Sequence, residues 1–234
     1  MNRSSTCAVV AAIGVALLAA AAVAAEKAKA PEAPKIDPGL PKVLIIGDSI
    51  SIGYTPTVQK LLAGKVNVVR IPGNGQHTAT GMAKLQGWLG SEKWDAIHFN
   101  WGLWDLAYRG VKDEKVRDKV DGKQFVPLEE YEKNLRELVK RLKATGAKLI
   151  WTTTTPVPDG DKGRFPNDEL KYNAVAEKIM KGNGVAVDDL HAAVMPRLKE
   201  LQLPGNVHFT PQGYEFLAEQ VAASILKALQ VPAK

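Results

Sequence analysis

Short apolar runs alternate with amphipathic segments along most of the chain. The apolar runs have the length of strands and cover residues 42–46, 66–71, 96–101, 148–154 and 185–188. Helical periodicity covers residues 55–62, 80–89, 128–145, 168–181, 192–201 and 211–229. Apolar strands that are each followed by a helix are typical of a parallel sheet covered on both faces. The pattern predicts an α/β fold, a three-layer α/β/α domain with a five-stranded, mainly parallel sheet.

The first 25 residues differ from the rest of the chain. They have a polar start with Arg3, an apolar run over residues 8–23, and small residues that fit cleavage after Ala25. A membrane anchor is the alternative, but the run is mostly alanine, which contributes little to a membrane-spanning helix. We therefore expect a signal peptide over residues 1–25 and a secreted or periplasmic product that meets the membrane only transiently, during export.

The composition after residue 25 narrows the possibilities further. Residues 26–41 contain four prolines among Lys, Ala and Glu, which predicts an extended tether before a single domain over residues 42–234. The only cysteine, Cys7, lies in the predicted signal peptide, so the mature chain has no disulfide and no thiolate metal site. The histidines lack metal-ligand spacing and no phosphate or dinucleotide loop occurs, so we expect no metal and no cofactor.

The charged residues give no sign of a nucleic-acid partner. The chain has 31 Lys and Arg against 25 Asp and Glu, and of these only Arg3 lies in the first 25 residues, which leaves 30 against 25. The basic residues are interspersed with acidic ones, as in residues 129–141. Such mixing is typical of solvated helix faces with i,i+4 pairs, rather than of a basic stripe that binds phosphates.

Two short segments at opposite ends of the domain carry the candidate chemistry. Ser49 directly follows the first apolar strand, where a helix begins and unpaired backbone N–H groups are available. A simple helix cap at Asp48 would also explain this segment. His208 comes just before the last helix, with Thr210 as its expected cap and Pro211 in its first turn. In a parallel sheet such loops lie at one edge, so Ser49 and His208 are a candidate nucleophile and base.

Four segments in order resemble the sequence blocks of the SGNH/GDSL hydrolase superfamily, and in particular its exported bacterial GDSL-like esterases. The segments are Gly47-Asp48-Ser49-Ile50, Ile71-Pro72-Gly73-Asn74-Gly75, Gly102-Leu103-Trp104-Asp105 and Val207-His208-Phe209. The resemblance implies a flavodoxin-like fold and an esterase that acts on acyl and acetyl esters. It implies Ser49 as the nucleophile, His208 as the base, and Ser49 and Gly75 as backbone donors to the oxyanion.

The chain departs from the superfamily at the oxyanion asparagine, where it has Trp104. The indole N–H could donate a hydrogen bond in its place. Asn74 and Asn100 are the other candidates, since each follows a strand next to the expected site. We expect Trp104 to stack on a sugar and Asn74 or Asn100 to donate to the oxyanion.

A second departure concerns the acid of the triad. The superfamily usually has an aspartate three residues before the histidine, and that position is Gly205. Asn206 follows it and could orient the imidazole, as the asparagine of Cys-His-Asn proteases does. Asp188 and Asp189 at the end of the fifth strand are alternatives, as is a backbone carbonyl of residues 203–205. We expect Asn206 to be the third member.

The substrate is predicted from the residues around this site. Asp48, Trp101, Trp104 and Asp105 are the expected substrate-binding residues, and the long polar segment 106–126 is expected to overhang the cleft. Export and an aromatic pair favour a small or glycan ester, such as an acetylated sugar, over a long-chain lipid. A short-chain carboxylesterase or lysophospholipase is the alternative enzyme. A secreted carbohydrate-binding pseudoenzyme is the alternative from another class.

Overall fold

The structure is a computed structural model that describes residues 36–232. Its main sheet has five strands, which pair in the order β2-β1-β3-β6-β7, and every pair is parallel. The strands are β1 (Lys42–Ile46), β2 (Asn67–Arg70), β3 (Ala96–Phe99), β6 (Lys148–Thr152) and β7 (Ala186–Asp188). The predicted five-stranded parallel sheet is therefore confirmed, and its strands are up to two residues shorter than predicted at either end.

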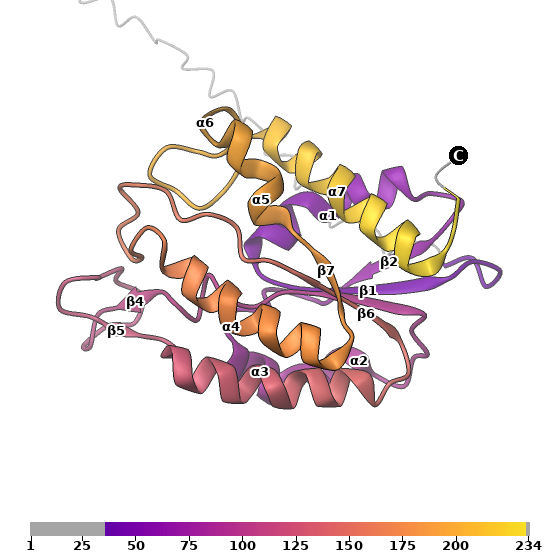
Figure 1. Cartoon of the computed structure of the whole chain (residues 1–234), viewed down its shortest axis with the longest axis horizontal. Coiled ribbons are helices and arrows are strands. Elements are labelled where there is room, and N and C mark those ends of the chain that lie inside the picture. Colours follow the sequence, from indigo (N-terminus) through magenta and orange to yellow (C-terminus); the bar gives the residue numbers. More distant parts are fainter. Residues whose placement is uncertain (1–35, 233–234) are drawn as a thin grey trace, which may run out of the picture. The chain divides into compact units, whose positions relative to one another are not determined.

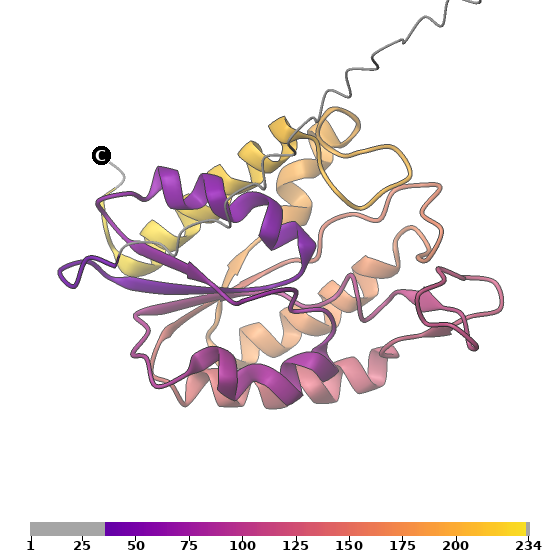
Figure 2. The ribbon, with the colours of Figure 1, turned by 180° about the vertical axis from the view of Figure 1, so that it is seen from behind.

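Helices cover both faces of this sheet, as Figures 1 and 2 show from opposite sides. One layer holds α1 (Ser49–Leu61), α7 (Pro211–Leu229) and the short α5 (Leu190–Val194) and α6 (Leu198–Leu201). The other layer holds α2 (Thr78–Leu89), α3 (Leu128–Lys143) and α4 (Asp168–Asn183). The three-layer α/β/α prediction is confirmed. The core between the layers includes the fully buried Phe99, Trp151 and Tyr131.

Two helices differ from the predicted pattern for local reasons. The first helix begins at Ser49 rather than at residue 55, because the Asp48 side chain accepts a hydrogen bond from the N–H of Ile50 and caps it. The predicted helix 192–201 is instead three short pieces, α5, a 3₁₀ turn over Met195–Arg197, and α6. Pro196 lies in the middle piece, where it cannot donate the backbone hydrogen bond of a continuous helix.

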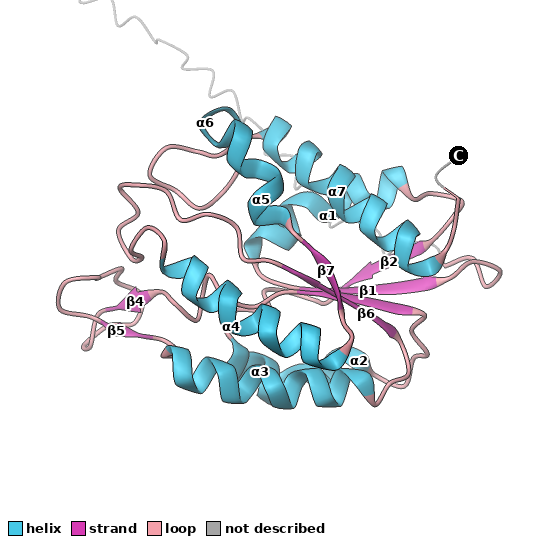
Figure 3. Cartoon of the chain, viewed as in Figure 1, coloured by secondary structure: helices cyan, strands magenta, loops and turns pink. Residues whose placement is uncertain are grey.

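The long segment after β3 contains a small hairpin that the sequence pattern did not predict. Its strands, β4 (Tyr108–Arg109) and β5 (Lys123–Gln124), pair antiparallel and form a separate two-stranded sheet. Figure 3 shows it apart from the main sheet, and Figure 1 places it on the side of the loops that follow β3 and β6. Strands of two mostly polar residues carry no alternation, so hydrophobic periodicity could not detect them.

The described part of the predicted tether is attached to the domain. The side chain of Asn67 accepts a hydrogen bond from the N–H of Asp37 and donates to the carbonyls of Asp37 and Leu40. These hydrogen bonds join residues 37–40 to the strand β2 of the domain. The predicted signal peptide and the rest of the tether lie outside the described residues. Within residues 36–232, no helix is both long enough and apolar enough to cross a bilayer.

Two glycines of α2 should respond oppositely to replacement by alanine. A Cβ at Gly81 would lie 2.8 Å from the buried ring of Trp101, whereas a Cβ at Gly87 would meet nothing within 4 Å. We expect Gly87→Ala to stabilise the fold by about 0.5–1 kcal/mol, the helix propensity gained over glycine. Gly81→Ala should destabilise it by about 1–3 kcal/mol, because the ring has no room to move. Urea unfolding of the two variants tests this, and equal shifts would contradict the described packing.

Candidate active site

Ser49 stands where β1 turns into α1, at the edge of the sheet where the parallel strands end. The chain leaves the buried strand through Gly47 and Asp48, and Asp48 caps the helix at 2.9 Å from the N–H of Ile50. Ser49 occupies the first helical position and its side chain is half-buried. The helix cap considered as an alternative from sequence is thus real, and it holds the Ser49 hydroxyl at the edge of the sheet.

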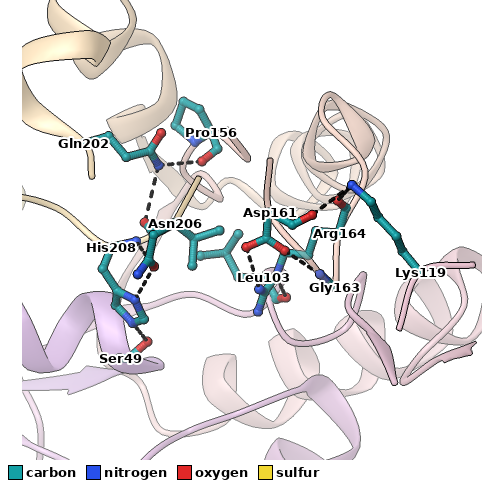
Figure 4. A network of polar contacts seen from close by, with 11 residues as sticks. Ser49, Leu103, Lys119, Pro156, Asp161, Gly163, Arg164, Gln202, Asn206 and His208 are labelled. Atoms are coloured by element: carbon teal, nitrogen blue, oxygen red, sulfur yellow. Dashed lines mark hydrogen bonds and ion pairs between the residues drawn. The ribbon is translucent and has the colours of Figure 1, made fainter. Parts of the chain in front are cut away.

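His208 reaches this serine from a loop 159 residues later in the chain. Its Nε2 lies 2.8 Å from Oγ of Ser49, and its Nδ1 lies 2.7 Å from Oδ1 of Asn206. The backbone N–H of His208 donates to the same Oδ1 at 3.1 Å. Figure 4 shows the resulting chain from Asn206 through His208 to Ser49. The structure brings together the three residues that the sequence proposed as nucleophile, base and third member.

Oδ1 of Asn206 accepts two hydrogen bonds from His208, and these determine which nitrogen of the neutral imidazole carries the proton. A backbone N–H can only donate, so the Asn206 atom that faces His208 must be the carbonyl oxygen. Because that oxygen can only accept, Nδ1 of His208 must carry the ring proton. Nε2 then has a lone pair directed at the Ser49 hydroxyl, as a general base requires.

Buried hydrogen bonds hold the loop that carries Asn206 and His208. The side chain of Gln202 is buried, and its Nε2 donates to the carbonyl of Pro156 at 2.7 Å and to that of Val207 at 3.3 Å (Figure 4). The N–H of Leu203 donates to the carbonyl of His208 at 2.9 Å, which closes the loop on itself. Fixed geometry of this kind keeps the base in reach of the nucleophile.

The other candidates for the third member have different partners. Asp188 accepts from the buried ring of His98 at 3.0 Å, and Asp189 accepts from the hydroxyl of Thr153 and caps α5. The carbonyl of Leu203 accepts the N–H of Asn206 rather than the imidazole. Of the four alternatives that the sequence left open, the geometry favours Asn206.

Arg70 joins the residues before and after Ser49 to the loop that follows β2. Its guanidinium donates to the carbonyl of Gly47 at 3.0 Å, to the hydroxyl of Ser51 at 3.0 Å and to the carbonyl of Gly73 at 2.7 Å. The rigid fork of an arginine suits several acceptors at once. Sequence reasoning missed Arg70, although a charged residue at the end of an apolar strand was a visible signal.

Two predicted oxyanion donors are already engaged, so these predictions need correction. The N–H of Gly75 donates to the carbonyl of Gly47 at 2.9 Å, and a Cβ on Gly75 would lie 2.7 Å from that oxygen. This close approach explains why residue 75 is a glycine. The same hydrogen bond also occupies the Gly75 N–H, which is then not available to an oxyanion. The amide nitrogen of Asn100 donates to the carbonyl of Thr152 at 2.7 Å and also lies 3.4 Å from the hydroxyl of Thr154.

Two predicted donors are not occupied by other hydrogen bonds in the described residues. The N–H of Ser49 belongs to the first turn of α1, where no intrahelical acceptor exists. Asn74 accepts the N–H of Gln76 through Oδ1 at 2.8 Å, and its amide nitrogen donates no hydrogen bond within the described residues. Ser49 and Asn74 therefore stay the predicted donors to the oxyanion.

Three of the four predicted substrate-binding residues are buried, which contradicts their placement in a cleft. Trp101 is completely buried and donates its indole N–H to the carbonyl of Gly75 at 3.3 Å. Asp105 is also completely buried and accepts from both the N–H and the hydroxyl of Thr78. Burial raises the pKa of Asp105 to about 7. Asp48 is 4% exposed and serves as the cap of α1.

Trp104 is the fourth of these residues and is half-buried. Its ring stacks on Phe125, with 6.0 Å between ring centroids and an interplanar angle of 27°. The guanidinium of Arg109 lies 5.3 Å from the same ring. His77 also contacts Phe125, at 5.2 Å between centroids, and its ring caps α2. Part of the Trp104 ring surface is thus covered by Phe125 and Arg109. Stacking of a sugar on this ring stays a prediction.

The fold and the site define a class of enzyme, and comparison with known proteins then gives the family. A parallel α/β sheet with a paired serine and histidine at one edge is the arrangement of a serine hydrolase. The sequence model of the GDSL-like Lipase/Acylhydrolase family matches residues 45–216. The chain belongs to this family, whose members are carboxylic ester hydrolases.

Individual relatives agree with this assignment. A GDSL esterase/lipase from Arabidopsis thaliana is 33% identical over 72 residues, which are 31% of this chain and 28% of that protein. A lipase/acylhydrolase from Enterococcus faecalis has the same fold, with a TM-score of 0.65 and 21% identity over 79% of this chain and 95% of that one. An acetylxylan esterase from Geobacillus stearothermophilus is similar, with a TM-score of 0.63 and 22% identity over 82% and 95% of the two chains.

The environment of His208 predicts an esterase that stays active in mild acid. Burial lowers the pKa of His208 below its ordinary value of 6.5, and Arg164 and Arg117 lower it further against the opposing effect of Asp48. A base must be neutral to accept a proton, so a lowered pKa extends activity to lower pH. We expect kcat/KM to rise to a plateau with a midpoint below pH 6.5. A pH profile on a neutral ester measures this, and a midpoint above 6.5 would argue against the described environment.

The hydrogen bond between Asn206 and His208 predicts different effects for substitutions at Asn206 and at Asp189, a rejected candidate for the third member of the triad. Asn206→Ala removes the acceptor that holds the ring proton on Nδ1, so we expect kcat to fall by about 10²- to 10⁴-fold, the usual range for general-base catalysis. Asp189→Asn should keep most of the activity, because the Asp189 carboxylate accepts from the Thr153 hydroxyl and from the N–H of Ala192 at the start of α5. Steady-state kinetics of the two folded variants decides between them, and a larger loss at Asp189 would move the acid role there.

Proposed function

We propose that this chain is an exported serine esterase that removes acetyl or other short acyl groups from carbohydrates. The observation that carries the proposal is the chain of hydrogen bonds from Asn206 through His208 to Ser49. A hydroxyl at 2.8 Å from a basic imidazole nitrogen is the arrangement of an activated nucleophile.

The reaction follows from the direction of these hydrogen bonds. Ser49 Oγ attacks the ester carbonyl while Nε2 of His208 takes the hydroxyl proton. The N–H of Ser49 and the amide of Asn74 stabilise the oxyanion, and the alcohol leaves with the proton from His208. Water then attacks the acyl-enzyme with His208 again as base, which releases the acid and restores the hydroxyl. Asn206 orients the ring throughout but adds no charge that would stabilise the imidazolium.

A small cavity lies at the ends of β1, β3 and β6. Its lining includes Asp48 and Ile50, the residues on either side of Ser49, but neither Ser49 nor His208. The preference for a short acyl group rests instead on the proteins that share the fold, among which are acetylxylan esterases.

Export and a carbohydrate substrate rest on other observations. The N-terminal 25 residues have the pattern of a signal peptide, which supports an enzyme that acts outside the cytoplasm. The half-buried Trp104 follows β3 and offers an aromatic surface, and such surfaces favour sugar rings. Acetylxylan esterases are among the proteins that share the fold. An acetylated sugar is consistent with all three.

Two substitutions test the proposal together. If Ser49 and His208 act as one unit, Ser49→Ala and His208→Ala should each abolish most hydrolysis of p-nitrophenyl acetate, and the double variant should lose little more. Turnover should also fall steeply from acetate to longer acyl chains. Independent, multiplicative losses would refute the catalytic pair, and a wild-type protein that binds acetylated sugars without hydrolysing them would instead be a carbohydrate-binding pseudoenzyme.

A further inference from the structure

Two arginines face each other across the polar insertion that follows β3. Arg109 and Arg117 form an isolated antiparallel bridge, and the N–H of Gly110 donates to the carbonyl of Val116 at 3.0 Å beside it. Side chains directly opposite in such a pair lie on the same face, about 5 Å apart at Cβ, where like charges destabilise the pairing. An anion bound near the two guanidinium groups would relieve this repulsion.

A third arginine lies against this pair. A Cβ on Gly163 would be 3.2 Å from Cβ of Arg117, so the Arg117 side chain runs over the residue next to Arg164. Arg164 is 4% exposed, and its Nε donates to the carbonyl of Leu103 at 2.7 Å. We call Arg109, Arg117 and Arg164 the arginine cluster.

The described acids do not balance this cluster. Asp161 lies 3.5 Å from Arg164 and also accepts the N–H of Gly163. No ion pair or hydrogen bond in the described part of the chain involves the guanidinium of Arg109 or of Arg117, and Nε of Arg109 is buried without a partner. The nearby Asp113 and Asp118 accept backbone N–H groups of their own turns. Within the described residues, Asp161 is the acid that forms an ion pair with a member of the cluster, whereas the Arg109 guanidinium lies over the rings of Trp104 and Phe125.

The cluster lies beside the candidate catalytic residues and has open space next to it. Figure 4 draws Asp161 and Arg164 in the same region as the chain of Asn206, His208 and Ser49, with other side chains between the two groups. Both Arg164 and Arg117 are near enough to lower the pKa of His208. Arg109, together with Lys123 and Glu114, also lines a cavity of about 280 Å³, in which cations outnumber the acid. A bulky anionic group could therefore reach Arg109 from solvent.

The position of His208 indicates which part of an ester would meet the cluster. A general base in ester hydrolysis returns its proton to the leaving alcohol, so the alcohol lies on the His208 side of the ester. Arginine forks bind carboxylates through paired hydrogen bonds. We propose that the arginine cluster binds a carboxylate on the alcohol part of the substrate, which makes the enzyme selective for acetyl esters of acidic sugars. This proposal rests on the esterase function proposed above.

A matched pair of substrates tests the selectivity. The wild-type protein should hydrolyse acetylated methyl glucuronoside with a kcat/KM about tenfold or more above that for acetylated methyl glucoside, the gain expected from a charge-assisted hydrogen bond. Arg117→Gln should reduce this ratio to near one, and added salt should lower it for the wild type. Lys112→Gln makes the same charge change at an exposed position of the same insertion and should leave the ratio unchanged. Equal rates on the two esters, or equal ratios for both variants, would overturn the proposal.

A binding measurement separates this proposal from the esterase function. With Ser49→Ala, isothermal titration should detect methyl glucuronoside binding at least tenfold tighter than methyl glucoside binding, and adding Arg117→Gln should remove the difference. If the binding difference appears but no acetyl ester is hydrolysed by the wild type, the anion site stands and the esterase proposal fails. If both esters are hydrolysed through Ser49 without preference and the two sugars bind alike, the esterase stands and the anion site fails.

Discussion

The site depends on one oxygen atom, Oδ1 of Asn206, which accepts both the backbone N–H and the ring Nδ1–H of His208. The backbone bond decides that this atom is an oxygen, and the ring bond then decides which imidazole nitrogen is basic. The sheet topology supplies the rest, because parallel strands bring the end of β1 and the loop before α7 to one edge. Without the asparagine the ring could rotate or change tautomer, and Ser49 would lose its base.

Asn206 orients the His208 ring but carries no negative charge, so other groups determine the electrostatic environment of the base. In the usual triad a carboxylate stabilises the imidazolium that forms during the reaction. Here the groups acting on His208 include Arg164 and Arg117, which disfavour the imidazolium, and the buried Asp48 and Asp161, which favour it. Burial of the ring is the largest effect, and it lowers the pKa of His208. An anionic substrate bound by the arginine cluster would offset part of that positive charge and so help the base at the moment it is protonated.

The fold, Ser49 and His208 could be predicted because periodicity and short motifs are local properties of the sequence. The engagement of Gly75 and Asn100 could not be predicted, because the bond from Gly75 to Gly47 and the bonds from Asn100 to Thr152 and Thr154 depend on how closely neighbouring strand ends approach. The direction of Trp101 was likewise set by packing against Gly81. The choice of Asn206 over the two aspartates needed the loop geometry that Gln202 holds.

The protonation of the His208 ring tests the central claim most directly. Nitrogen NMR of the protein labelled with ¹⁵N in histidine distinguishes the two neutral tautomers from the imidazolium, and a His208→Gln variant assigns the signal among the four histidines. At pH 7 the account predicts a neutral ring with its proton on Nδ1, and loss of that single tautomer in Asn206→Ala. A ring that is protonated on Nε2, or that is charged at pH 7, would contradict it.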